Sequence, residues 1–142
     1  MTEFVEFKSE HVRNLLNEPE VEHLRPYYSE ATFRNLERLP FTMSIAQDGV
    51  VVASGGVSPY YSGRGIAWVF FHHSCRRNFR PVFRLVKQWL DDVPVRRIEA
   101  AVRIVDSQAH RWVRLLGFEL EAPVARCFEV NGDDCALYAR VK

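Results

Sequence analysis

The chain has 142 residues, of which 47% are hydrophobic and 26% are charged, and its formal net charge is +1. A chain of this length and composition is expected to fold as one domain, 1–142, around a core that needs no disulfide and no metal. Because no stretch approaches the ~18 apolar residues of a membrane-spanning helix and the acidic start does not resemble a signal peptide, we expect a cytoplasmic protein without a membrane partner.

The first half of the chain reads as a helical segment followed by strands. We expect a strand at 4–7, a helix at 10–17, a second helix that follows Ser29 and ends at Leu39, and strands at 42–47, 50–57 and 65–73. Ser9 and Ser29 precede the two helices, and their side chains can accept the first free backbone N–H groups. Pro19 and Pro26 bracket a loop between the helices.

Glycine marks two special places in these strands. Asp48-Gly49 separates two of them and is the strongest hairpin signal in the chain. Gly55-Gly56 lie inside the next strand and indicate a bulge or the close approach of another backbone. The strand at 65–73 is almost continuously apolar, which is typical of a central strand covered on both faces.

The second half alternates helices and strands. We expect a helix at 79–90, a strand at 95–104, a helix at 107–116, and strands at 118–122, 125–130 and 136–142. The first of these helices should bury Val82, Leu85, Val86 and Trp89. A hairpin that feeds a β-α-β-α-β unit predicts an α/β domain, a mixed sheet with helices on both faces.

Positive charge gathers where the central apolar strand meets the following helix. Residues 76–114 carry 10 Lys/Arg against 4 Asp/Glu, whereas residues 1–40 carry 5 against 8. Arg76, Arg77 and Arg80 lie at this junction, where free helix N–H groups and the helix dipole favour an anion. Such a site suits a phosphate group, although the same arginines could solvate the helix end or pair with the acidic N-terminal segment.

Three residues near this junction are candidate catalytic groups. His72 and His73 end the central strand, and a histidine there can act as a base because its pKa lies near neutrality. Adjacent strand residues point to opposite faces, so we expect the two histidines to diverge and to bind no metal. The three cysteines show no CxxC spacing, which also predicts free thiols rather than zinc. Tyr61, placed on a loop beside Tyr60, could supply a phenolic acid or merely cover a cleft.

The segment DSQAHRWVRLLGFELE, residues 106–121, reads as a capped helix, a glycine stop and a strand. Asp106 or Ser107 can cap the helix, and Gly117 can end it. Its apolar side chains follow helical spacing and should face the core: Ala109, Trp112, Val113 and Leu116. Spacing alone favours a packing role for this helix.

These features together resemble the GNAT superfamily of N-acetyltransferases. The resemblance rests on "ASGGV" after the hairpin, on the central strand with its helix, and on "LLGFELE", and it covers nearly the whole chain. It implies a single GNAT-like domain with acetyl-CoA in a V-shaped gap between two central strands. It further implies transfer of the acetyl group to an amine of a small molecule or a protein.

The resemblance also implies where the cofactor binds. The family's turn, (Gln/Arg)-x-x-Gly-x-(Gly/Ala), corresponds to Arg77–Val82, or begins at Arg76 one register earlier. The implied cofactor contacts are Ser74, Arg76, Arg77, Asn78 and Arg80 in this turn, and Asp106 and Ser107 before the last helix. Asn78, Arg80 and Val82 occupy the glycine positions, so arginine side chains must hold more of the cofactor. Val113 stands where the family commonly has a tyrosine as general acid.

Two other functions stay open at this point. "RRNFR" and "RWVRLLGF" also resemble GNAT-like proteins of tailed phages, which implies a non-catalytic virion component or host-interaction module. Its location would be the host cytoplasm or the virion. Nucleic acid is not expected as a partner, because the positive surplus is modest and the aromatic residues show core spacing. A homodimer is compatible with the exposed strands near the C-terminus.

Overall fold

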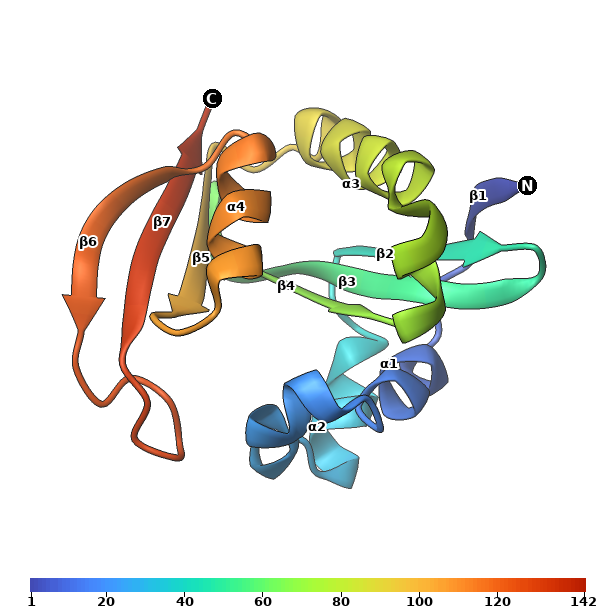
Figure 1. The fold of residues 1–142 in the computed structure, drawn as a ribbon. Coiled ribbons are helices and arrows are strands. Elements are labelled where there is room, and N and C mark those ends of the chain that lie inside the picture. Colours follow the sequence, from blue (N-terminus) through green and yellow to red (C-terminus); the bar gives the residue numbers. More distant parts are fainter. The chain divides into compact units, whose positions relative to one another are not determined.

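The structure is a computed structural model that describes all residues, 1–142. Its strands form a mixed seven-stranded sheet in the order β1-β2-β3-β4-β5-β7-β6, with flanking helices (Figure 1). The strands are β1 (Thr2–Val5), β2 (Phe41–Gln47), β3 (Val50–Tyr61), β4 (Arg64–Phe71), β5 (Arg97–Arg103), β6 (Glu119–Ala125) and β7 (Cys135–Val141). The helices are α1 (Ser9–Leu15), α2 (Glu30–Leu36), α3 (Phe79–Asp92) and α4 (Ser107–Leu115), with 3-10 helices η1 (Pro19–Tyr27) and η2 (His73–Asn78). The predicted α/β class is confirmed.

The chain divides into two compact units. The N-terminal unit comprises Met1–Val57 and Trp68–Val93, and the C-terminal unit comprises Ser58–Ala67 and Pro94–Lys142. β3 and β4 each contribute residues to both units. None of the helices has the length and apolar character that crossing a membrane would need.

In the N-terminal unit, helices cover both faces of the strands. α1 and α2 lie on one side of the β2–β3 hairpin and α3 lies on the other (Figure 1). The core on the α1 side consists of the buried residues Val12, Leu15, Leu16, Phe33, Leu36 and Phe70. On α3, Val82, Val86 and Leu90 are buried, whereas Leu85 and Trp89 are half-buried. The buried stripe of α3 therefore ends at Leu90 instead of the predicted Trp89.

Of the two serines predicted to cap helices, one does so. The hydroxyl of Ser29 accepts the backbone N–H of Thr32 at 3.3 Å and caps α2. Ser9 instead lies inside the first turn of α1, which Lys8 precedes as the cap residue. The Ser9 amide donates to the carboxylate of Glu37 at 2.7 Å, so a residue beyond α2 anchors the start of α1.

The β2–β3 hairpin confirms the two glycine signals. Asp48 and Gly49 have φ values of 51° and 83°, as a tight two-residue turn requires. A side chain at Gly55 would collide with the carbonyl oxygen of Trp68, and one at Gly56 with that of Phe41. The glycine pair therefore marks close backbone approach, and the bulge of this hairpin lies elsewhere, at Ile45/Ala46 on β2.

In the C-terminal unit, β5 is the central strand. It pairs in parallel with β4 and antiparallel with β7, which in turn pairs with β6. The side chain of Asp106 accepts the Ala109 amide at 3.1 Å and caps α4, so Asp106 rather than Ser107 is the cap. Tyr138 on β7 is 1% exposed, and its hydroxyl lies 2.7 Å from Nδ1 of His110 on α4.

Four predicted segments are wrong in detail. The first strand spans Thr2–Val5 instead of 4–7, and the loop predicted between the prolines at positions 19 and 26 is the 3-10 helix η1. The predicted strand at 125–130 does not form, because Cys127 has a φ of 53° and its amide donates to the side chain of Asp134. β3 continues to Tyr61, which therefore lies on a strand and not on a loop.

Candidate functional site

The carboxyl end of β4 leads directly into a tight turn. β4 ends at Phe71, and the residues that follow form η2, after which α3 begins at Phe79. The Ser74 amide donates to Nδ1 of His72 at 3.1 Å, and the Ser74 hydroxyl lies 2.7 Å from the same nitrogen. This local hydrogen bonding fixes the His72 ring where the strand hydrogen bonds stop.

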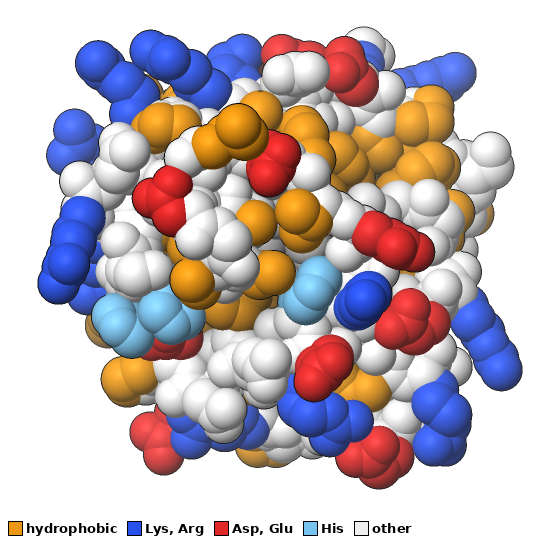
Figure 2. Space-filling model, turned by 90° about the vertical axis from the view of Figure 1, so that its right-hand side faces the viewer, with side chains coloured by type: hydrophobic (Ala, Val, Ile, Leu, Met, Phe, Trp, Pro, Cys, Tyr) orange, Lys and Arg blue, Asp and Glu red, His pale blue; other side chains and the backbone are white.

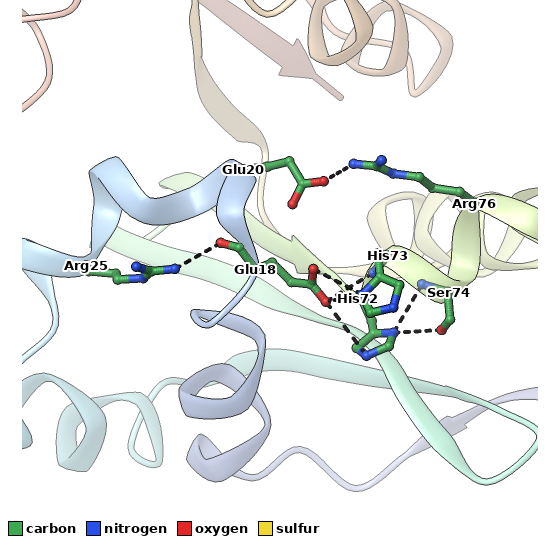
Figure 3. A network of polar contacts seen from close by, with 7 residues as sticks. All are labelled: Glu18, Glu20, Arg25, His72, His73, Ser74 and Arg76. Atoms are coloured by element: carbon green, nitrogen blue, oxygen red, sulfur yellow. Dashed lines mark hydrogen bonds and ion pairs between the residues drawn. The ribbon is translucent and has the colours of Figure 1, made fainter.

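His72 and His73 lie on the same side of the chain. Their rings stack with centroids 4.2 Å apart and planes 30° from parallel (Figure 3). The prediction that they diverge is wrong, because both residues follow the end of the strand and the alternation of strand side chains no longer applies. The structure thus brings together two candidate side chains that were predicted to point in opposite directions.

Both histidines face the carboxylate of Glu18, which the sequence analysis did not single out. Glu18 immediately precedes η1 and is only 8% exposed. Its Oε1 accepts from the backbone N–H of His73 at 3.2 Å and lies 3.0 Å from Nδ1 of the same residue. Nε2 of His72 lies 3.7 Å from this oxygen. No local motif marks Glu18, because it meets the histidines only through the fold.

Burial and hydrogen bonding act on Glu18 in opposite directions. Burial alone would raise the pKa of its carboxyl, since the charged form loses water. The hydrogen bonds from His73 and the proximity of His72 outweigh this effect and hold the pKa of Glu18 below its usual value. The carboxyl is therefore a buried anion at neutral pH.

These three residues border an open pocket of about 620 Å³ in the N-terminal unit. The pocket is also lined by His11 and Asn14 of α1, by Asn17 after this helix, and by Val50 and Val51 at the start of β3. Burial lowers the pKa of His11, and its Nδ1 lies 2.8 Å from the Ser44 hydroxyl. Histidine side chains reach the surface of the face drawn in Figure 2, and the side chain of His73 is 67% exposed. The cluster is thus accessible to a ligand from solvent.

The three predicted arginines differ in their surroundings. The Arg76 guanidinium forms an ion pair with the carboxylate of Glu20 on η1 (Figure 3). Arg77 and Arg80 are exposed and make no ion pair. One arginine therefore pairs with the acidic N-terminal segment, as one alternative proposed, and two remain available to an anion.

At the junction between β4 and α3, a phosphate would find charged arginine side chains more readily than free backbone N–H groups. In η2 the Cys75 amide already donates to the carbonyl of His72 at 3.2 Å, and Pro81 in the first turn of α3 has no N–H. The Asn78 carbonyl accepts from the side chain of Gln47 at 2.8 Å, which holds the start of α3 against β2. The exposed guanidinium groups of Arg77 and Arg80 are thus available to an anion, whereas a glycine-type amide cradle is not present at this turn.

The remaining predicted residues belong to the C-terminal unit. Asp106 uses its carboxylate to cap α4, and Ser107 is the first residue of that helix. Val113 on α4 is half-buried and carries no titratable group. Tyr61 is 57% exposed, and the Arg64 guanidinium lies 5.8 Å from its ring centre and 4.8 Å from that of Tyr60.

Known proteins resemble this chain in structure but not in sequence. No protein-family model matches the sequence, and no curated protein is similar to it in sequence. Solved structures with the same fold are numerous. A chimera of the spermidine N-acetyltransferase SpeG from Vibrio cholerae and hSSAT has a TM-score of 0.76 at 12% identity, covering 99% of this chain and 95% of its own.

Two further structures extend this likeness. Ard1 from Thermoplasma volcanium has a TM-score of 0.73 at 17% identity, covering 99% of this chain and 97% of its own. The yncA protein from Salmonella typhimurium, solved with its cofactor acetyl-CoA, has a TM-score of 0.72 at 11% identity, covering 99% of this chain and 94% of its own. The chain therefore has the fold of the GNAT acetyltransferases.

Proposed function

We propose that this protein is an N-acetyltransferase that takes an acetyl group from acetyl-CoA and transfers it to an amine. The observation that carries the proposal is the GNAT-like fold over the full chain, shared with the spermidine N-acetyltransferase chimera and with the yncA protein, which was solved with acetyl-CoA. The two exposed arginines at the β4–α3 junction add the positive charge that the phosphates of CoA need. The acceptor amine, of a small molecule or a protein, and homodimer formation are further proposals.

When bound, acetyl-CoA would supply the activated acetyl thioester. Arg77 and Arg80 would hold its anionic part, and Ser74 and Asn78 are further predicted contacts in the same turn. Holding two reactants in the right geometry lowers the barrier without a protein nucleophile. The proton that leaves the attacking amine would pass to water, His72 or His73, and Tyr61, predicted as an acid, would supply a proton to the departing thiolate of CoA.

Titration of the purified protein with acetyl-CoA by calorimetry tests this proposal. We expect saturable binding, weakened in Arg77→Ala and Arg80→Ala, and weaker binding of dephospho-CoA than of CoA if the arginines also contact the 3′-phosphate. Arg38→Ala, which removes an exposed arginine after α2, is the matched control and should bind like the unmodified protein. Failure to bind acetyl-CoA at millimolar concentration would refute the proposal.

A specific observation favours a second function, that of a non-catalytic protein with the same fold. The turn offers no glycine cradle, the carboxylate of Asp106 is engaged in capping α4, and Val113 provides no acid. This alternative includes the virion component or host-interaction module that the phage resemblance implies. It predicts binding of neither acetyl-CoA nor CoA, so the same titration separates the two functions.

A further inference from the structure

We propose that Glu18, His72 and His73 form a binding site for a divalent transition-metal ion, with Zn²⁺ as the reference ion. One ligand atom of each residue lies within 4.8 Å of the other two: a carboxylate oxygen, Nε2 of His72 and Nδ1 of His73. This inference concerns a site within the N-terminal unit and does not depend on the proposed acyl transfer.

Two of the three distances between these atoms are close to those in a metal centre, and the third, between the two histidine nitrogens, is within 4.8 Å. Ligands that bind Zn²⁺ at ~2.0–2.1 Å in a tetrahedron lie about 3.3 Å from one another. The Glu18 oxygen lies 3.0 Å from Nδ1 of His73 and 3.7 Å from Nε2 of His72, which brackets that value. Small rotations of the side chains would therefore bring the three atoms onto one ion.

The chemistry of the three groups selects a class of metal. Two imidazole nitrogens with one carboxylate oxygen make a ligand set used by catalytic zinc sites, which keep a position open for water or substrate. Mg²⁺ and Ca²⁺ prefer oxygen ligands only. The pocket that borders the three residues leaves room for such an open position.

Neighbouring groups hold two of the ligands in place. The Ser74 amide donates to Nδ1 of His72 at 3.1 Å, and the Ser74 hydroxyl lies 2.7 Å from the same nitrogen, so the ring is held with Nε2 on the side of Glu18. An ion bound at Nε2 would require the ring proton on Nδ1, where the Ser74 hydroxyl could accept it in place of the amide contact. Arg25 donates to the backbone carbonyl of Leu16 at 2.7 Å. It also donates to the backbone carbonyl of Glu18 at 3.3 Å, which fixes the chain at this residue (Figure 3). The site is thus pre-shaped by contacts that do not use the ligand atoms.

A purely structural role for the cluster is the competing explanation. In that case Nδ1 of His73 donates a hydrogen bond to the carboxylate of Glu18, and the cluster holds η1 against the end of β4 without a metal. The two explanations differ in what they predict for added metal. A structural network gains nothing from Zn²⁺, whereas a metal site is stabilised by an ion that binds the folded chain.

The test uses the full chain after removal of metal with a chelator. Calorimetric titration with ZnCl₂ should show one saturable site per chain, and Co²⁺ should give the visible absorption of a four- or five-coordinate ion. Glu18→Gln and His73→Gln should each weaken Zn²⁺ binding by at least about 10-fold, since even loss of a supporting group costs that much. Excess Mg²⁺ should leave Zn²⁺ binding unchanged.

His23→Gln is the matched control, because His23 lies on η1 outside the three-residue cluster and its loss should not alter affinity. The exposed side chain of His73 makes His73→Gln a variant that should fold, which circular dichroism checks. Three results would each overturn the proposal. They are absence of saturable Zn²⁺ binding, a Zn²⁺ affinity in Glu18→Gln and His73→Gln equal to that of the unmodified protein, and displacement of Zn²⁺ by Mg²⁺. Acetyl-CoA binding is measured separately, so failure of one proposal leaves the other intact.

Discussion

The two compact units use their polar side chains in different ways. In the N-terminal unit, Glu18, His72 and His73 meet at an open pocket, and two arginines beside them are unpaired. In the C-terminal unit, the carboxylate of Asp106 is engaged in capping its helix. The first unit therefore leaves polar side chains open to solvent at a pocket, whereas the carboxylate of Asp106 in the second unit is used to stabilise a helix.

In the C-terminal unit, several arginines and carboxylates are also engaged with one another in ion pairs. Glu99 lies between two arginines, with Nε of Arg64 at 2.5 Å and Nε of Arg97 at 2.8 Å. Arg97 also pairs with Glu121 at 2.5 Å. A guanidinium held by two carboxylates is less free to bind a ligand, so this network ties strands together.

The largest effect is expected where backbone meets backbone in the N-terminal unit. Gly55→Ala places a methyl group against the Trp68 carbonyl, which cannot move without disturbing the sheet. We expect a loss of about 1–3 kcal/mol in the free energy of unfolding, as for an overpacked core. Denaturant unfolding followed by circular dichroism measures it. An unchanged midpoint would show that β3 and β4 approach less closely at this point.

The next effect concerns the buried hydroxyl of the C-terminal unit. Nε2 of His110 lies 3.0 Å from the Arg103 carbonyl and can donate to it, which leaves Nδ1 to accept the proton of the Tyr138 hydroxyl. Tyr138→Phe should cost about 1–2 kcal/mol of unfolding free energy, because the histidine nitrogen loses its partner. A double-mutant cycle with His110→Ala measures the coupling. Additive losses would place the hydroxyl outside any shared hydrogen bond.

A smaller effect should depend on pH. Hydrogen bonds from Arg64 and then Arg97 hold the pKa of Glu99 below its usual value of 4.5. The pairing therefore stabilises the folded chain above that pH, and the stabilisation is lost as pH falls through the lower folded-state pKa. Glu99→Gln should lower the unfolding free energy at pH 7 by on the order of 1 kcal/mol. The difference from the unmodified protein should shrink toward pH 3 in denaturant titrations.

If that difference instead grew on acidification, the sign of the linkage would be wrong and the network would not stabilise the charged carboxylate. Glu3→Gln is the matched control. It removes an exposed carboxylate on β1 and should leave the pH dependence of unfolding unchanged.

The smallest effect on stability is expected at the candidate site. The side chain of His73 is 67% exposed, and surface substitutions usually change the unfolding free energy by less than about 0.5 kcal/mol. His73→Gln should therefore unfold at nearly the same denaturant concentration as the unmodified protein. A loss well above this value would mean that the histidine cluster supports the fold, as the polar groups of the C-terminal unit do.

Much of the fold was predictable because its signals are local. The turn at Asp48-Gly49, the cap at Ser29 and the long helix α3 each depend on residues a few positions apart. Prediction from sequence failed where a side-chain contact to the backbone decided the local conformation. The Cys127 amide donates to the side chain of Asp134, seven residues further on, and this turn replaces the strand expected at 125–130.

The candidate site was predictable only in part for the same reason. The arginines and histidines near the end of β4 form a compact sequence cluster, and the sequence marked them. Glu18 lies 54 positions before His72, counting from 18 to 72, and a single acid in an acidic segment carries no distinguishing pattern. The stacking of His72 on His73 depends on where β4 stops. The strand was expected to continue to 73 but ends at Phe71, so the alternation of strand side chains applies to neither histidine.

The ion pair between Arg76 and Glu20 links the turn after β4 to η1. An anion that engaged Arg76 would compete with a carboxylate, and the 3-10 segment carrying that carboxylate would lose one of its anchors. Short 3-10 helices have weaker hydrogen-bond geometry than α-helices, so such a segment should respond readily. Faster exchange of the η1 amide hydrogens with deuterium would then indicate that a ligand has bound at the turn after β4. Occupancy of the turn would in this way become visible as a change in the mobility of a different segment.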